Sequence, residues 1–335
     1  MNEFDFIKNY LPNYQTDHEL LCGVGDDAAV LRPQNGFDWH ISTDMLIAER
    51  HFFSDIAPDD LAYKILAVNI SDMAAMGAVP KYVLLSAAMP QLDKKWLDLF
   101  FSSLHKVLND YQIKLIGGDT VKGDCVFNVT IIGQTPKGLA LKRNGAKTGD
   151  DIWVSGYLGL AAVGLLLEQE KRNLSGSLKN NIQDIIRLPE NILSQCTNKL
   201  LRPVPQIQLG QALLNIANSA LDCSDGLLQD LTHILEQSQK NAVIYLDKIP
   251  SLPELKQFNN YPQWILSGGD DYELIFTANK QQTQQIQKIS QECCIPLTKI
   301  GTIIEQEESV LCRVLNTENG QEIKLNKTCF DHFSD

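Results

Sequence analysis

Apolar and polar positions alternate along the first part of the chain in a pattern that predicts strands and helices in turn. Residues 39–44 place bulky side chains at every second position, which is typical of a strand with one buried face. Pro58 and the two acids after it favour the start of a helix, whose apolar positions continue to Ala74. Gly77 and Pro80 are expected to end that helix.

The same alternation continues to about residue 132. Residues 82–85 and 126–132 are predicted to be strands, and residues 113–116 form a shorter one. Between them, apolar residues at three- and four-residue spacing over 96–108 predict an amphipathic helix. This half of the chain therefore predicts helices that cover a sheet.

A segment that bears glycine and lysine, residues 134–149, separates this half from a second set of elements. That set comprises predicted strands at 152–154, 243–246 and 272–276 and helices that end near Leu167 and begin after Asp225. A chain of 335 residues suggests about two domains of ~150 residues. We predict a mixed fold (α+β, or mixed α/β) in two domains, residues 1–137 and 138–335.

The net charge and the placement of the cysteines limit which classes of partner and which cellular compartment are expected. The chain has 41 acidic and 29 basic residues, a net charge of −12, which argues against duplex nucleic acid or an anionic membrane as its main partner. The eight cysteines are scattered without a C-x-x-C pair, and residues 1–5 are acidic with no apolar stretch after them. We expect reduced thiols in a cytoplasmic protein.

Aspartates gather beside glycine and hydroxyl residues where strands are predicted to end. Glycine lets a backbone approach a ligand closely, and carboxylates with hydroxyls supply the oxygen ligands that Mg²⁺ prefers. Several such corners together predict a nucleotide site that contains metal ions. The corners are residues 23–27, 42–44, 117–120, 222–226 and 268–271, with Asp72 near the end of the first predicted helix.

Other interpretations of these segments can be compared with the sequence. Asp225 could simply cap the helix that follows it. Residues 145–148 lack the glycines of a P-loop, and residues 23–28 lack the following helix of a dinucleotide fingerprint because Pro33 comes too soon. No G-x-S-x-G elbow occurs. Phosphate chemistry in this chain would therefore run through metal ions.

Seven segments of the chain carry its most distinctive motifs: residues 23–30, 42–46, 51–52, 67–78, 117–120, 222–227 and 267–274. In this order they resemble the thiamine-monophosphate kinases, a family within the aminoimidazole ribonucleotide synthetase-like superfamily of ATP-binding enzymes. The match extends from about Phe4 to Phe333.

The resemblance implies transfer of the γ-phosphoryl group of ATP to thiamine monophosphate, with several Mg²⁺ ions. It also implies a homodimer in which the N-terminal domains share a β-barrel flanked by helices, and a C-terminal α+β domain that closes the substrate cleft. We expect the strands near residues 39–44 and 82–87 to contribute the apolar surface of that twofold interface.

The resemblance further implies roles for individual residues. The implied magnesium ligands are Asp27, Ser42, Thr43, Asp44, Asp72, Asp119, Asp222 and Asp225, of which Asp44, Asp72 and Asp119 are assigned to catalysis. The implied ATP contacts are Gly118, Asp119, Arg143 and Ser224, and the implied substrate contacts are His51 and Asp270. The family usually has glutamate where this chain has Asp270. An aromatic wall of the substrate site falls on Lys327 in the simplest pairing, or on Phe330.

Two further hypotheses stay open at this stage. The chain could be another ATP-dependent enzyme of the same superfamily, similar to aminoimidazole ribonucleotide synthetase or selenophosphate synthetase. It could also be a metal-dependent thiamine-phosphate or nucleotide binding protein without catalysis. The presence of Asp27, Asp44, Asp72 and Asp119 together argues against binding alone, because binding needs fewer metal ligands.

Overall fold

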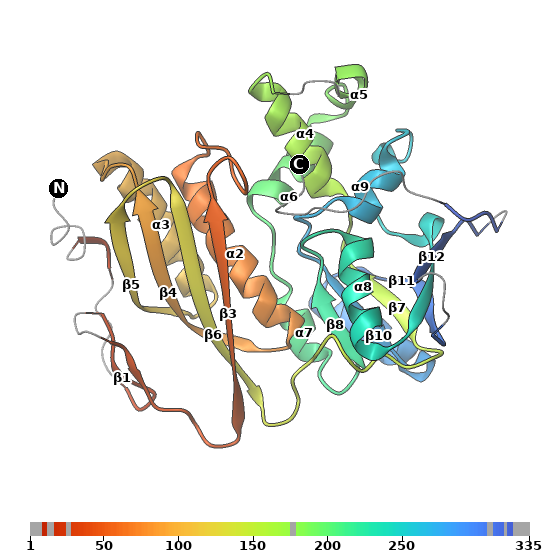
Figure 1. Ribbon diagram of the computed structural model, residues 1–335, viewed down its shortest axis with the longest axis horizontal. Helices are drawn as coiled ribbons and strands as arrows, with labels where there is room; N and C mark the ends of the chain where they lie inside the picture. Colours follow the sequence, from red (N-terminus) through yellow and green to blue (C-terminus); the bar gives the residue numbers. More distant parts are fainter. Residues whose placement is uncertain are drawn as a thin grey trace. The chain divides into compact units, whose positions relative to one another are not determined.

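The computed structural model describes residues 9–11, 17–24, 28–174, 179–306, 311–317 and 320–323. The chain divides into two compact units (Figure 1). The first comprises Met1–Met73 and Ala78–Ala140, and the second comprises Ala74–Gly77 and Leu141–Asp335. The predicted mixed α/β fold in two domains is confirmed.

The first unit contains a four-stranded sheet with helices on one face. The strand order is β3 (Phe37–Ile47), β6 (Val126–Pro136), β4 (Val79–Met89) and β5 (Lys114–Lys122). Only the β4–β5 pair is parallel. Helices α2 (Pro58–Ala75) and α3 (Lys94–Asp110) lie against one face, where Phe100 of α3 stacks on Phe127 of β6 (Figure 1). We call this the helix face and the other one the open face.

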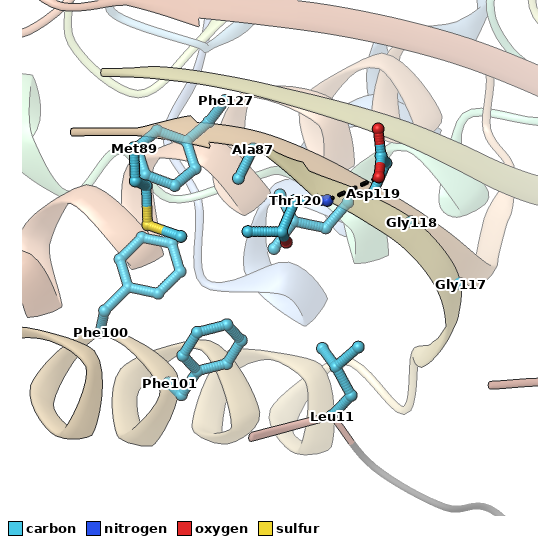
Figure 2. A pocket seen from close by; sticks show the side chains of 11 residues that line it. Leu11, Ala87, Met89, Phe100, Phe101, Gly117, Gly118, Asp119, Thr120 and Phe127 are labelled. Atoms are coloured by element: carbon cyan, nitrogen blue, oxygen red, sulfur yellow. Dashed lines mark hydrogen bonds between the residues drawn. The ribbon is translucent and has the colours of Figure 1, made fainter. Parts of the chain in front are cut away.

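The aspartates predicted to stand at the ends of two strands lie within those strands instead. Asp44 is in the middle of β3, and β5 continues through Gly117 and Gly118 past Asp119. Gly118 is needed in this strand because β4 passes very close: a Cβ at this position would overlap the carbonyl oxygen of Leu85. Gly118 therefore allows the backbones of β4 and β5 to pack against each other, where both strands line the pocket shown in Figure 2.

A hairpin covers part of the open face. It consists of β1 (Leu20–Cys22) and β2 (Val30–Leu31), and Leu20 packs against Tyr82 and Ile116. The remainder of this face carries exposed apolar side chains, among them Ile41 at 69%, Met45 at 54% and Val121 at 53%.

The second unit is built on a six-stranded sheet that is buried on both faces. The strand order is β12 (Cys312–Leu315), β9 (Asn241–Tyr245), β11 (Leu297–Ile304), β7 (Asp151–Ser155), β10 (Leu274–Ala278) and β8 (Ser219–Asp222). Its α-helices are α4 (Leu160–Lys171), α5 (Lys179–Ile185), α6 (Glu190–Leu201), α7 (Ile207–Ala212), α8 (Leu227–Ser238), α9 (Tyr261–Ser267) and α10 (Thr283–Cys293).

Alternation along the central strands divides the apolar side chains of the second unit between two cores. Val154 and Ile275 join one core with α4, α8 and α9, whereas Trp153 and Phe276 join the other with α7 and α10. Successive side chains of a strand point to opposite faces, so both faces need covering helices. None of the helices in the part of the chain that the structure describes has the length and apolar character needed to cross a bilayer.

Candidate functional site

In the first unit, α2 and β3 bring two of the predicted metal ligands into contact. The Ser42 hydroxyl donates a hydrogen bond of 2.5 Å to the Asp72 carboxylate. Asp44 follows Ser42 by two residues on the same strand, and its backbone N–H donates a hydrogen bond of 3.2 Å to the side-chain oxygen of Asn69. Asn69 is buried and donates in turn to the carbonyl oxygen of Ile65, so its orientation is set by its own helix. The helix thereby positions the strand that carries Ser42 and Asp44.

Thr43 points the other way. Its hydroxyl donates to the carbonyl oxygen of Val129 at 3.1 Å and lies 3.1 Å from the Thr130 hydroxyl, on the open face. Alternation along a strand requires this, because Ser42 and Asp44 share the helix face. The side chains of the three consecutive predicted ligands therefore do not all face Asp72.

Asp119 lies at the opposite edge of the same sheet from Asp44. Asp44 is in register with Gly118 through β6 and β4, which puts three strand spacings, about 14 Å, between the two edges. Asp119 pairs with Ser86, which belongs to the open face, whereas Asp44 belongs to the helix face. One chain does not bring Asp119 together with Asp44 and Asp72.

His51 lies beyond the end of β3. Its Nδ1 accepts a hydrogen bond of 3.1 Å from the backbone N–H of Ile47, and the neighbouring Phe52 packs near Phe127. Ile47 is three residues after Asp44, or about 10 Å along an extended strand. His51 is thus held in the first unit, just beyond the strand that carries Ser42 and Asp44.

In the second unit, two loops bring four predicted site residues together. Asp222 ends β8, the loop after it carries Ser224 and Asp225, and the loop after α9 carries Asp270. The Asp270 N–H donates to the carbonyl oxygen of Ser224, and the Tyr272 N–H donates to that of Cys223, both at 2.8 Å. A Cβ at Gly269 would overlap the Ser224 carbonyl oxygen, so the paired glycines allow this approach.

The helix-cap interpretation of Asp225 is wrong. Helix α8 has no side-chain cap at its first residue, and Asp230 in its first turn accepts the N–H groups of Asp225 and Gly226, at 3.1 and 3.0 Å. Asp225 instead accepts a hydrogen bond from Gln229. Burial, with Asp222 and Asp225 nearby, raises the pKa of Asp230 to about 8.

Two acids beside Asp270 anchor its loop, and the sequence analysis did not single them out. The fully buried Asp271 accepts the N–H groups of Gly159 and Ala161, at 2.6 and 3.1 Å, at the start of α4. Burial raises its pKa to about 7. Glu273 pairs with Lys199 and accepts a hydrogen bond from Ser155. Asp270 is therefore tied through its own N–H to Ser224 and is followed directly by a stretch that these two buried acids anchor.

Asp270 and Tyr272 also adopt positive φ angles of 64° and 49°. This conformation is uncommon for residues other than glycine, and the anchoring contacts maintain it. It also explains why the strand predicted at 272–276 begins only at Leu274.

Known proteins match this chain along most of its length. Residues 25–135 match the N-terminal domain, and residues 147–312 the C-terminal domain, of the AIR synthase related proteins. A thiamine-monophosphate kinase from Buchnera aphidicola subsp. Acyrthosiphon pisum (strain APS) is 41% identical over 99% of this chain and 98% of its own. The chain belongs to the thiamine-monophosphate kinase family.

Solved structures with the fold of this family are similar along most of the chain. A thiamine-monophosphate kinase from Stenotrophomonas maltophilia K279a superimposes with a TM-score of 0.79 at 36% identity, covering 91% of this chain and 93% of its own. A structure described as AaThiL complexed with AMPPCP and TMP gives 0.74 at 27% identity, covering 92% of each chain.

Arg143 lies at the other end of α8 from Ser224. Its carbonyl oxygen accepts from Ser238, the last residue of that helix, whereas Ser224 precedes the first. A helix of this length spans about 18 Å. Arg143 and Ser224, the two ATP contacts predicted in the second unit, are therefore not adjacent. Their assignment to ATP stays a prediction.

Three further residues named in the sequence analysis, Asp27, Lys327 and Phe330, lie outside the described residues.

We expect the stability of this family member to fall as the pH rises towards neutrality in the absence of metal. Asp230 and Asp271 have pKa values of about 8 and about 7, above the ~3.9 of an unfolded aspartate. The folded protein then holds more protons than the unfolded one between about pH 4 and 8, so the free energy of unfolding decreases across that window. Thermal unfolding in EDTA at a series of pH values measures this. Asp230→Asn should flatten the upper part of the curve, and a midpoint that rises with pH in both proteins would contradict the assignment.

Proposed function

We propose that this chain transfers the γ-phosphoryl group of ATP to thiamine monophosphate, giving thiamine diphosphate and ADP. The observation that carries the proposal is identity with a named thiamine-monophosphate kinase, 41% over 99% of the chain. The two contacting loops of the second unit support it, because they juxtapose Ser224, proposed for ATP, with Asp270, proposed for the substrate.

The reaction needs placement more than it needs a base. An oxygen of the acceptor phosphate forms the new bond to the γ-phosphorus, while the bond from that phosphorus to the β,γ-bridging oxygen breaks and ADP leaves. The second pKa of a phosphate monoester is ~6, so near neutral pH the attacking oxygen is already ionised. The protein's task is to hold two anionic groups in line, which ordered loops such as that of Asp270 can do.

The donor set fits Mg²⁺. The side chains proposed as ligands are carboxylates and hydroxyls, hard oxygen donors, and Ser42 already contacts Asp72. Among the described residues no three acidic, cysteine or histidine side chains form a ready cluster. Mg²⁺ typically takes one or two carboxylates and completes its shell with phosphate oxygens and water. When bound, it would neutralise charge on the phosphates.

We assign the remaining roles on the same basis. Asp44, Asp72 and Asp119 would act in catalysis as metal ligands, with Ser42, Thr43, Asp222, Asp225 and Asp27 completing the set. Gly118, Asp119, Arg143 and Ser224 would contact ATP, and His51, Asp270 and Phe330 the substrate. Residues 1–137 would hold nucleotide and metal, and residues 138–335 would close over the substrate. A cytoplasmic location stays a prediction.

The direct test is product formation. Purified protein with Mg-ATP and thiamine monophosphate should yield thiamine diphosphate and ADP in equal amounts, resolved by chromatography. Hydrolysis of ATP without thiamine diphosphate would contradict the proposal and point to another enzyme of the superfamily. Binding of both ligands without turnover would point to a binding protein.

We also propose that the chain forms a homodimer through the open face of the first sheet, with the strands of the two copies making a shared barrel. The exposed Ile41, Met45 and Val121 support this, since exposed apolar groups on one face mark an interaction site. Twofold symmetry is the commonest closed arrangement of identical chains. A monomer of 37.5 kDa in sedimentation at micromolar concentration would contradict it.

A further inference from the structure

A buried carboxylate of the second unit is surrounded by polar side chains that the roles assigned so far do not use. Through Oε1, Glu273 forms an ion pair with Lys199 of α6. Its Oε2 accepts hydrogen bonds from the Ser155 hydroxyl and, at 3.1 Å, from the Gln206 amide. The side chains of Glu273 and Lys199 are only 5% and 14% exposed. Segments that are distant in the chain therefore meet at one buried ion pair.

The backbone beside Glu273 makes room for this network. Gly156 follows β7 directly and has a φ of 56°, and a Cβ there would overlap the Glu273 carboxylate. A buried ion pair adds little stability compared with apolar side chains of similar size, because both charges lose their hydration. The network therefore needs an explanation other than stability, and its connections to the backbone offer one.

The network is connected to the segment that carries Asp270. The Ser155 hydroxyl, which donates to Glu273, accepts a hydrogen bond from the N–H of Leu274, at 2.8 Å. Asp270 precedes Glu273 by three residues, and Asp270 and Tyr272 have positive φ angles of 64° and 49°. A residue with a side chain keeps such a conformation only where the surrounding contacts maintain it. The ion pair and its hydrogen bonds are among these contacts.

We propose that the ion pair of Lys199 and Glu273 positions Asp270 for thiamine monophosphate by holding residues 270–273 in this conformation. The proposal rests on the proposed function and on the assignment of Asp270 to the substrate, and it adds two positioning residues to that site. Without the ion pair, the backbone of the segment would relax towards negative φ angles. The Asp270 carboxylate would then be displaced from the substrate.

The first test removes one charge of the pair. Glu273→Gln keeps the length of the side chain, and we expect the KM for thiamine monophosphate to rise about tenfold, the size expected when one hydrogen bond to a charged group is misaligned. The KM for ATP should be unchanged, because Asp230 separately accepts two backbone N–H groups of the loop that carries Ser224. Steady-state kinetics with each substrate varied in turn measures both constants.

This pattern separates positioning from a loss of folded protein. Partial unfolding would lower the apparent kcat and leave both KM values at those of the parent. Glu273→Gln also leaves the Lys199 ammonium buried without a counter-charge, which destabilises a fold. A double variant, Lys199→Met with Glu273→Gln, removes both charges. It should show the same selective rise in the KM for thiamine monophosphate, with a thermal midpoint close to that of the parent.

Glu168→Gln is the matched control for the single variant. Glu168 belongs to α4, its side chain is 6% exposed, and it pairs with Lys171 and Arg172, so the same change removes an equally buried charge in the same unit. It should lower the thermal midpoint and leave both KM values unchanged. Thermal unfolding of each variant alongside the kinetics checks this.

The outcomes distinguish the positioning role from the proposed function. If the parent forms thiamine diphosphate and the variants at Glu273 keep its KM values, only the positioning role is wrong. An equal rise in the KM for ATP, or the same rise in Glu168→Gln, would also overturn that role. A parent that forms no thiamine diphosphate would overturn both proposals.

Discussion

Replacing Asp72 with asparagine should reduce turnover by about a hundredfold or more, the loss typical when one charge-stabilising group is removed from a phosphoryl-transfer or acyl-transfer site. Asparagine is nearly isosteric, and its side-chain oxygen can still accept the hydrogen bond that Ser42 donates to Asp72. The fold of the first unit should therefore survive, because only a negative metal ligand disappears. Steady-state rates at limiting and saturating Mg²⁺, with thermal unfolding alongside, measure both effects.

Asp110→Asn is the matched control for this variant. Asp110 is the last residue of α3 and is exposed, so the same change of charge occurs in the same unit, outside the proposed ligand set. It should keep the parent's rate at every Mg²⁺ concentration. Near-normal turnover of Asp72→Asn at limiting Mg²⁺ would mean that Asp72 is not a ligand.

Thiamine without its phosphate should not be phosphorylated at a measurable rate. Its hydroxyl would need a base to remove the proton, and none of the residues assigned to the site is placed for that task. His51, the one histidine assigned to it, accepts a hydrogen bond through Nδ1 from the backbone N–H of Ile47, the last residue of β3. Thiamine monophosphate, in contrast, brings an ionised oxygen and further phosphate oxygens for Mg²⁺.

Parallel assays of the two acceptors with saturating Mg-ATP decide the point. The loss with thiamine should fall on kcat as well as on KM, because the missing phosphate is the nucleophile as well as an anchor. Comparable kcat values for the two acceptors would show that a catalytic base exists in the chain.

Much of the site was accessible from the sequence because its motifs are local. Alternation and helix-start signals predicted the strand that carries Ser42 and Asp44 and the helix that carries Asp72, and the structure contains both as β3 and α2. The paired glycines before Asp270 marked a close approach, and the Ser224 backbone is what approaches them. Such features are encoded within a few consecutive residues, so propensity and spacing expose them.

What surrounds those residues could not be predicted in the same way. Nothing in the spacing of 270–273 distinguishes Asp270, assigned to substrate, from Asp271 and Glu273, which are buried against α4 and Lys199. Likewise, Asp230 rather than Asp225 accepts the backbone N–H groups at the start of α8, and this depends on which of the two acids is buried. These outcomes follow from contacts between elements distant in the chain.

The sequence by itself determined the family, the mixed fold and the residue types at each Gly–Asp segment, because these depend on local pattern and on motifs in a fixed order. Only the tertiary structure decided which of those residues meet. Asp72 contacts Ser42, and Asp270 contacts Ser224, while Asp44 and Asp119 stand at opposite edges of one sheet. Strand order and the face on which a side chain points are set when apolar faces of distant segments are buried together, and that choice is made by packing over the whole unit.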